Sequence, residues 1–423
     1  MNYVGTARPI HDAKGKATGY TKYAGDLSLP NMAYLCMLHS KIPHGYVKAV
    51  HAEKALALPG VYGVYHCLNT SDRKYNRYRS NFDQSYLPNE ECAFNDYVRF
   101  VGDKIGVVAA CDQETAERAA RLVEVEYEEL PFSIGFDDTL AGKNCLEGET
   151  PVRDEYTLEV GKKQESTEGL IEVCSTMELP RLHHATMETH ACIADYDPYS
   201  DMLTVYCPNQ AVHGIRTVLA DFLEMPESHV RVVKATMGGS FGAKQEWFLE
   251  PVTALVAKKL CRPVKLVYSR GEAMTDTIVR GAMRMSARGY YTPDGEMKEI
   301  YCDVTLDAGA YIGNAGDYVR ALAGKPTRCY RIPYMHYHGQ VISSNSPVSG
   351  AFRSWSAAEE ALMMERQLDA AAEKLGMDRL AIRLKNVARS GEEDKKLHLS
   401  LEDIRIGDAI TLGSEKFGWD KLK

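Results

Sequence analysis

Val230-Arg-Val-Val-Lys-Ala-Thr-Met237 and the glycine loop that follows it, Gly238-Gly-Ser-Phe-Gly-Ala-Lys244, decide the fold of this chain. The first stretch predicts a strand because it is rich in β-branched residues. After the loop, Pro251 and an apolar face from Val252 to Leu260 predict a helix. A glycine loop between a strand and a helix exposes backbone N–H groups and can therefore hold an anionic or oxo-bearing ligand. A tight turn alone would also explain these glycines, because the loop is neither a Walker loop nor a G-x-G-x-x-G fingerprint.

Gly350-Ala-Phe-Arg-Ser-Trp355 forms a second loop of this kind. It continues into Ser356-Ala-Ala-Glu359, which predicts a capping box. An apolar face from Ala361 to Leu375 predicts the helix that follows, and Gly376 is expected to end it. We therefore expect the loop around Arg353 to lie at a helix N-terminus, where the helix adds partial positive charge.

The chain is expected to have two domains of an α+β fold. Strands are predicted at residues 61–65, 105–110 and 123–127, with a helix capped by Asp112 between the last two. Residues 1–132 then form a small N-terminal α/β domain, and the polar, Gly- and Glu-rich stretch 133–170 is predicted to be a linker. Residues 171–423 form a mixed α/β domain with a helix at 215–223 and a long hairpin over 283–306.

Composition excludes several classes of function. The net charge is −8 and Lys and Arg are scattered among acidic residues, so we expect no nucleic acid as partner. No apolar stretch reaches the roughly 18 residues of a membrane span, and the first residues lack a signal-peptide pattern. A cytoplasmic protein without a membrane partner is therefore expected. Eleven cysteines stand singly without a C-x-x-C pair, so this chain is not expected to hold its own iron–sulfur cluster or zinc ion.

Several motifs occur in one order along the chain: Arg99-Phe-Val-Gly-Asp103 with Val125-Glu-Tyr-Glu-Glu-Leu-Pro131, then His184-Ala-Thr-Met-Glu-Thr-His190, then the two loops. In this order they resemble the molybdenum-binding subunits of the xanthine dehydrogenase family of molybdenum hydroxylases. The glycine loop is similar to the family's G-G-G-F-G-G-K, and the loop at Arg353 is similar to its A-F-R-G-F-G. The resemblance covers nearly the whole chain. It implies a hammerhead-like N-terminal domain followed by a first molybdenum-cofactor-binding domain.

The resemblance also implies the cofactor and the residues around it. Molybdenum is expected to be held through molybdopterin, in the cytosine dinucleotide form, near Gln210, Phe241 and Arg353. Gln210 is similar to the family's glutamine that hydrogen-bonds the apical oxo group, and an amide donor suits an oxo acceptor. Gly239, Phe241 and Gly242 resemble the residues whose backbone lies against the metal centre, and Phe352 with Arg353 resembles the second loop at that centre. A glutamine satisfied in a turn after Pro208, and core packing of Phe352, are the alternatives.

Three further residues are expected at the substrate. Trp355 matches a family aromatic that stacks on a heteroaromatic ring, although core packing would also explain it. Gln245 stands where purine-oxidising members have a Glu, and Arg320 resembles their substrate-orienting Arg, with a plain surface Arg as an equal alternative. A neutral Gln245 favours nicotinate-like acids over purines. Ser354 stands where a carbon monoxide dehydrogenase has Cys, so that branch is disfavoured.

His184, Glu188 and His190 would share one face of a strand and could bind a metal ion. The family has the same segment without a metal, so we expect structural hydrogen bonds from these residues instead. No role is evident for His183.

The family's catalytic base lies in a G-E-P segment, and this chain has none. The resemblance therefore implies that the base comes from a second molybdopterin-binding subunit, as in the nicotinate dehydrogenase arrangement, or that the sequence is truncated. A [2Fe–2S] subunit and an FAD subunit would carry the electrons, in a dimer of heteromers. The implied reaction is hydroxylation of an N-heteroaromatic substrate, nicotinate-like or purine, by water. An aldehyde oxidoreductase subunit and a non-catalytic scaffold subunit are the alternatives.

Overall fold

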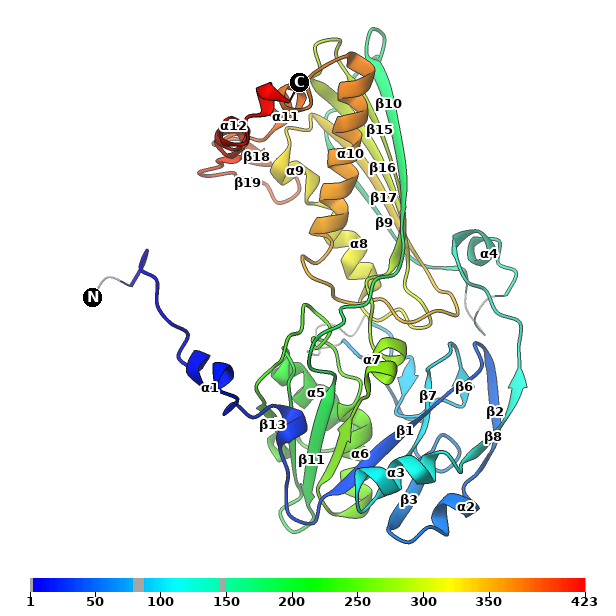
Figure 1. Cartoon of the computed structure of the whole chain (residues 1–423). Coiled ribbons are helices and arrows are strands. Elements are labelled where there is room, and N and C mark those ends of the chain that lie inside the picture. The colour runs from blue at the N-terminus through cyan, green and yellow to red at the C-terminus, as the bar shows by residue number, and fades with distance from the viewer. Residues whose placement is uncertain (1–2, 79–86, 145, 147–149, 423) are drawn as a thin grey trace. The chain divides into compact units, whose positions relative to one another are not determined.

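A computed structural model describes residues 3–78, 87–144, 146 and 150–422. The chain forms two compact units, each of which is built from two separate stretches of sequence. The first unit comprises Met1–Pro131 and His183–Ile278, and the second comprises Phe132–Leu182 and Val279–Lys423. Both mix helices and strands (Figure 1), so the predicted α+β class is confirmed.

The first unit contains a seven-stranded sheet in the order β13-β12-β11-β14-β1-β7-β3. Its strands are β1 (Ala33–His39), β3 (Val61–His66), β7 (Lys104–Ala110), β11 (Ala191–Asp197), β12 (Met202–Cys207), β13 (Val230–Lys234) and β14 (Val264–Val267). The parallel pair β1 and β14 joins the N-terminal strands to the later ones in one sheet. The strands predicted from β-branched runs at residues 61, 105 and 230 are therefore real and lie in the same layer.

Smaller elements complete the first unit. A three-stranded sheet has the order β6-β2-β8, and β4 pairs with β5. These strands are β2 (Gly45–His51), β4 (Lys74–Tyr75), β5 (Glu91–Cys92), β6 (Tyr97–Val98) and β8 (Glu124–Glu129). The helices are α1 (Ala13–Ala17), α2 (Glu53–Leu56), α3 (Gln113–Ala120), α5 (Val212–Phe222), α6 (Glu250–Leu260) and α7 (Arg270–Asp276). Asp112 caps α3 through the N–H of Thr115, as its position predicts.

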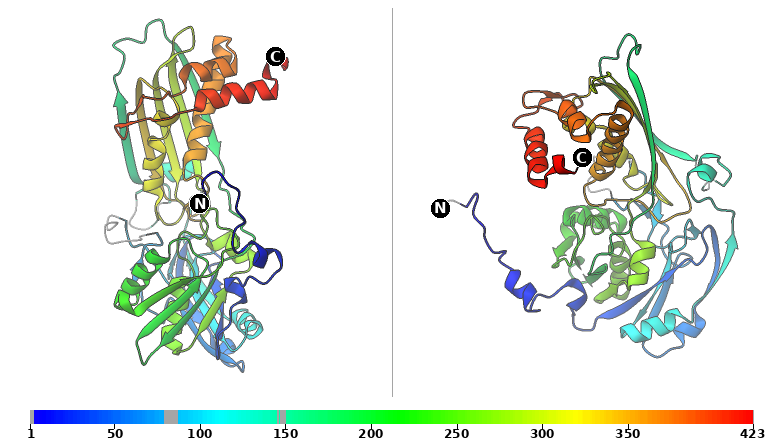
Figure 2. Two further views of the ribbon diagram at one scale, coloured as in Figure 1. Left: turned by 90° about the vertical axis from the view of Figure 1, so that its left-hand side faces the viewer. Right: turned by 45° about the horizontal axis from the view of Figure 1, so that its top comes forward.

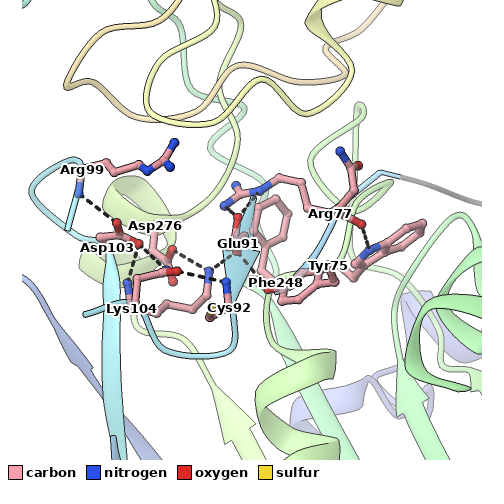
Figure 3. A network of polar contacts seen from close by, with 12 residues as sticks. Tyr75, Arg77, Glu91, Cys92, Arg99, Asp103, Lys104, Phe248 and Asp276 are labelled. Atoms are coloured by element: carbon pink, nitrogen blue, oxygen red, sulfur yellow. Dashed lines mark hydrogen bonds and ion pairs between the residues drawn. The ribbon is translucent and has the colours of Figure 1, made fainter. Parts of the chain in front are cut away.

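A buried network of charges ties the β4–β5 hairpin to β7 and α7 (Figure 3). Glu91 pairs with Arg77 and with Lys104, whose Nζ lies 2.8 Å from Glu91 Oε1 and 3.4 Å from Asp276 Oδ1. Burial raises the pKa of Asp276, but the charge of Lys104 and the hydrogen bonds from His39 and Tyr268 together outweigh it and lower that pKa to about 2. The Arg77 guanidinium also lies over the Phe248 ring, 4.9 Å from its centroid. This network anchors the N-terminal strands to the residues that follow the glycine loop.

The second unit is built on a five-stranded sheet in the order β10-β15-β16-β17-β9. Its strands are β9 (Val152–Gly161), β10 (Ile171–Leu179), β15 (Ala282–Tyr291), β16 (Met297–Asp307) and β17 (Tyr334–Ile342). β15 and β16 form the predicted hairpin. A short pair of strands, β18 (Glu393–Asp394) and β19 (Leu399–Ser400), stands apart from this sheet.

Helices cover one face of the five-stranded sheet. They are α8 (Ala315–Ala323), α9 (Pro326–Cys329), α10 (Ala357–Leu375), α11 (Arg379–Asn386) and α12 (Ile406–Phe417), whereas the short helix α4 (Phe136–Leu140) lies apart from them and contacts Arg284 of β15 (Figure 1). α8 packs on β9 and β17 and α10 packs on β10 and β15, and their side chains share one apolar core with the sheet. Helices α10 to α12, orange to red in Figure 2, lie together on that side. Gly376 ends α10 as predicted.

The domain limits expected from the sequence stay a prediction. The two compact units describe a different division of the chain, in which each unit combines two separate stretches. Residues 133–170, expected as a linker, contain α4 and β9, and β9 pairs along its length with β17. No helix in the described part of the chain is long and apolar enough to cross a membrane.

Candidate cofactor site

Three glycines of the glycine loop have a structural role. Two of them adopt a backbone conformation that favours glycine, and the third leaves room for a neighbouring side chain. Gly239 and Gly242 have φ of +96° and +102°, and Phe241 between them has φ of 56°. A Cβ on Gly238 would lie 2.6 Å from the Cβ of Glu188, which is closer than side chains approach. The glycines therefore serve both the left-handed turn and the close approach of Glu188.

Glu188 holds both ends of the glycine loop. Its Oε2 accepts from the backbone N–H of Gly238 at 2.7 Å and pairs with Nζ of Lys244 at 2.6 Å. The Lys244 side chain is only 2% exposed, and burial lowers its pKa although the ion pair with Glu188 opposes this shift. The pair lies 56 residues apart in sequence, so the loop closes through a long-range contact.

His190 also binds the glycine loop. Its Nε2 lies 2.9 Å from the carbonyl oxygen of Ala243, to which it donates, and its buried Nδ1 has no partner among the described residues. Burial lowers the pKa of His190 to about 4, so the ring is neutral at neutral pH. His183 Nε2 contacts the carbonyl of Ala273 at 2.9 Å, and His184 packs edge-on against His183.

The segment with His184, Glu188 and His190 is irregular and precedes β11, so the three side chains do not share the face of a strand. Glu188 and His190 make the structural hydrogen bonds that the sequence predicts. Within the described ranges, no cluster of three His, Cys, Asp or Glu side chains is arranged to hold a metal ion.

Gln210 is joined to the glycine loop at two points. Its backbone N–H donates to the carbonyl of Lys244 at 2.8 Å, and its Oε1 accepts from the Ser240 hydroxyl. The Gln210 side chain is exposed, and its Nε2 has no acceptor among the described residues. The predicted neighbours Gln210, Gly239, Phe241 and Gly242 thus lie together in the first unit.

The loop at Arg353, in the second unit, has a strained backbone. Ser354, Trp355 and Ser356 have φ of 83°, 44° and 63°, three successive left-handed residues without a glycine. Lys325 holds this turn, because its Nζ donates to the carbonyl of Trp355 and to the hydroxyl of Ser356. The predicted capping box at Ser356 is therefore wrong: the hydroxyl binds Lys325 and caps no N–H of α10.

Arg280 supports the other side of this loop. Its guanidinium lies 4.1 Å from the ring centroid of Phe352, and its Nη2 donates to the carbonyl of Arg353 at 3.3 Å. Its Nε pairs at 2.8 Å with Glu359, the residue expected in the capping box. The Arg353 side chain is exposed and has no ion-pair partner in the described part of the chain.

Both parts of the sequence match known families. Residues 149–387 match the Molybdopterin cofactor-binding domain, and residues 18–131 match the Aldehyde oxidase and xanthine dehydrogenase, a/b hammerhead domain. The chain belongs to this molybdenum hydroxylase family.

Curated relatives agree with this assignment. The xanthine dehydrogenase molybdenum-binding subunit of Escherichia coli O157:H7 is 30% identical over 97% of this chain and 56% of that protein. The nicotinate dehydrogenase large molybdopterin subunit of Eubacterium barkeri is 31% identical over 96% of each chain. The chain therefore spans about half the length of the former relative and nearly all of the latter.

Solved structures show the same fold. The aldehyde oxidoreductase from Desulfovibrio desulfuricans superposes with a TM-score of 0.91 at 21% identity, over 99% of this chain and 47% of that one. Quinoline 2-oxidoreductase from Pseudomonas putida 86 superposes with a TM-score of 0.87 at 23% identity, over 99% of this chain and 55% of that one.

The residues present fit the molybdopterin group that the family binds. The backbone N–H groups of Gly239, Ser240, Phe241 and Gly242 have no acceptor among the described residues, and the Phe241 side chain is 52% exposed. Together with Gln210 Nε2 they form a set of neutral donors on one turn. Such a set suits the oxygen atoms of an oxo group or a pterin better than it suits a bare cation.

The residues expected at the substrate lie in different surroundings. Gln245 is half-buried beside the glycine loop. The ring of Trp355 is half-buried and lies 5.3 Å from that of Tyr318, against the core of the second unit. Arg320 is held by Asp154, whose two oxygens lie 2.6 and 2.8 Å from the guanidinium nitrogens. Sequence reasoning missed Ser240, Arg280 and Lys325, which act through contacts far along the chain.

Proposed function

We propose that this chain is the molybdopterin-binding subunit of a molybdenum hydroxylase that hydroxylates an N-heteroaromatic substrate with water. The observation that carries the proposal is the turn whose four backbone N–H groups, like Nε2 of Gln210, have no acceptor among the described residues. The cofactor, when bound, supplies the two-electron oxidation and the activated oxygen. The chain itself supplies binding and orientation through this turn.

The proposal extends to the cofactor's form and to the second loop. The guanidinium of Arg353 has no ion-pair partner among the described residues and suits an anionic oxygen of the cofactor, and a cytosine dinucleotide form would offer its phosphates.

Partner subunits complete the proposed enzyme. A second molybdopterin-binding subunit would contribute the catalytic Glu, and [2Fe–2S] and FAD subunits would carry the electrons away, in a cytoplasmic dimer of heteromers. The near-complete match to the nicotinate dehydrogenase large molybdopterin subunit supports this arrangement.

We propose nicotinate-like acids ahead of purines as substrates. Gln245 offers a neutral donor and acceptor and cannot supply the negative charge that a carboxylate would place beside a purine ring. Trp355 offers a ring face for stacking. Arg320 would attract a substrate carboxylate only by releasing Asp154, so we expect it to contribute less than Trp355.

The complex should therefore turn over nicotinate faster than xanthine, hypoxanthine or an aromatic aldehyde. Gln245→Glu should raise the ratio of purine to nicotinate kcat/KM, because it restores a carboxylate at the ring. Gln164→Glu, which makes the same change at an exposed position in the other unit, is the matched control. Preference for the aldehyde would support the aldehyde oxidoreductase alternative, and an unchanged ratio in Gln245→Glu would remove Gln245 from the substrate site.

A further inference from the structure

In the glycine loop, Ser240 stands where the family pattern G-G-G-F-G-G-K has a glycine. Its oxygen accepts from the backbone N–H of Lys244 at 3.1 Å, and its proton goes to Oε1 of Gln210. The backbone N–H of Gln210 donates in turn to the carbonyl of Lys244 at 2.8 Å. These three hydrogen bonds close a ring through Gln210, Ser240 and Lys244, which we call the Gln210 ring. A glycine at position 240 could not form it.

The Gln210 ring determines which end of the carboxamide is free. A hydroxyl has one proton to donate. If the carboxamide were turned over, Nε2 would face Ser240, and the Ser240 proton would have no acceptor among the described residues. Either orientation makes one hydrogen bond with Ser240, but only the one with Oε1 on Ser240 gives the buried hydroxyl proton an acceptor, and it leaves Nε2 as the donor toward a bound group.

Ser240 and Gln210 differ in burial. The residue Ser240 is only 7% exposed, whereas Gln210 is exposed. Solvent therefore has little access to the hydrogen bond that fixes the carboxamide. Nε2 has no acceptor among the described residues and belongs to the exposed residue of the pair, so a bound group can reach it.

We infer that Ser240 is a positioning residue that fixes the Gln210 carboxamide with its nitrogen toward the bound group. This inference rests on the proposed function, because the acceptor of Nε2 is an oxygen of the molybdenum cofactor. A donor fixed before binding loses less conformational freedom when it meets its acceptor. The hydrogen bond from Ser240 thus fixes the orientation of the Gln210 carboxamide before binding. Without it, the bound acceptor alone would have to select that orientation.

The first test reads the carboxamide itself and needs no metal. The full chain is labelled with ¹⁵N-glutamine, and the side-chain NH₂ signals of Gln210 are assigned by their loss in Gln210→Glu. Ser240→Ala should shift and broaden these signals, because the carboxamide then rotates, and Ser240→Thr should restore them. Position 240 does not have a left-handed φ, so alanine fits its backbone. Unchanged Gln210 signals in Ser240→Ala would overturn the inference.

The second test uses the assembled complex loaded with molybdenum. Ser240→Ala should lower kcat about 3- to 10-fold with little change in KM, as expected for one lost hydrogen bond. Gln210→Ala should lower kcat about 100-fold, and the double variant should be no slower than Gln210→Ala. Effects that multiply in the double variant would mean that Ser240 does not act through Gln210.

Two controls separate the possible failures. Ser200→Ala removes an exposed hydroxyl that binds Asp197 in the same unit, and it should change neither the Gln210 signals nor kcat. If the wild-type complex holds no molybdenum, the proposed function fails, and the NMR test alone then decides the role of Ser240.

Discussion

The glycine loop and the loop at Arg353 depart from the family pattern to the same extent but with opposite structural consequences. In the first loop Ser240 and Ala243 stand where the pattern has glycine, and neither has a left-handed φ. In the second, Ser354 and Ser356 stand where the pattern has glycine, and both do. At its substituted positions the first loop has gained a hydrogen bond without strain, whereas the second has kept its shape at a cost of about 1–2 kcal/mol for each left-handed serine.

The difference shows how each loop is held. The first retains glycine where φ requires it, and its ends are pinned by the ion pair between Glu188 and Lys244. The second depends on Lys325 and Arg280, which bind its carbonyl groups from outside. Strain that persists in a folded protein must be imposed by its surroundings, and it collects at functional sites.

The largest effect is expected from Lys244→Met, which leaves the Glu188 carboxylate, only 14% exposed, without its cation. We expect a loss of about 3 kcal/mol in the free energy of unfolding, measured by chemical denaturation of the chain. Lys48→Met is the matched control, because its ion pair with Glu128 is more than half exposed on both sides and should cost less than about 1 kcal/mol. Equal losses in the two variants would mean that the buried pair does not pin the loop.

Acid should weaken the first loop through His190. Its folded pKa of about 4 lies below the ordinary value of 6.5, so the unfolded chain binds the proton more readily. The stabilisation is therefore complete above pH 6.5 and is lost as the pH falls toward 4. His190→Gln should lose less stability than the wild type between pH 6.5 and 4 when thermal unfolding is followed across that window. Parallel curves for the two proteins would contradict this assignment.

The smallest effects compare the two loops most directly. A serine-to-glycine substitution should change the free energy of unfolding in opposite directions in the two loops. Ser354→Gly should raise the free energy of unfolding by about 1 kcal/mol, since it relieves a left-handed φ at an exposed residue. Ser240→Gly should lower it by about 1 kcal/mol, since it breaks the Gln210 ring and adds freedom to the unfolded chain. Changes of the same sign in both variants would refute the contrast between the loops.

Local signals in the sequence predicted most of the elements. β-branched runs indicate β3, β7 and β13, Asp112 caps α3, and Pro251 lies in the first turn of α6. β9 was missed, although Tyr156, Leu158 and Val160 alternate with polar residues, because the stretches around it are polar and rich in glycine. The capping box at Ser356 failed because Lys325, 31 residues away, competes for the hydroxyl.

The sequence predicts those site residues that belong to a motif. It does not predict those whose role depends on a contact with a residue far away in sequence. The two loops and Gln210 could be read from their order and spacing. The roles of Ser240 and Arg280 could not, because each depends on a partner 30 or more residues away: Ser240 on Gln210 and Arg280 on Arg353. Asp154 likewise lies 166 residues from Arg320, so nothing near Arg320 in sequence shows that its charge is already paired.

The central claim is that the free N–H groups of the glycine loop and Gln210 hold a molybdopterin cofactor. The most direct test is the content of molybdenum and pterin in the native complex purified with this chain, set against the same complex carrying Gly239→Val. We predict molybdenum and pterin in equimolar amounts with the chain in the wild type, and loss of both in the variant, because valine at a φ of +96° distorts the turn. A wild-type complex without molybdenum would support the scaffold alternative, and a variant that retains full cofactor would contradict the placement of the cofactor at this loop.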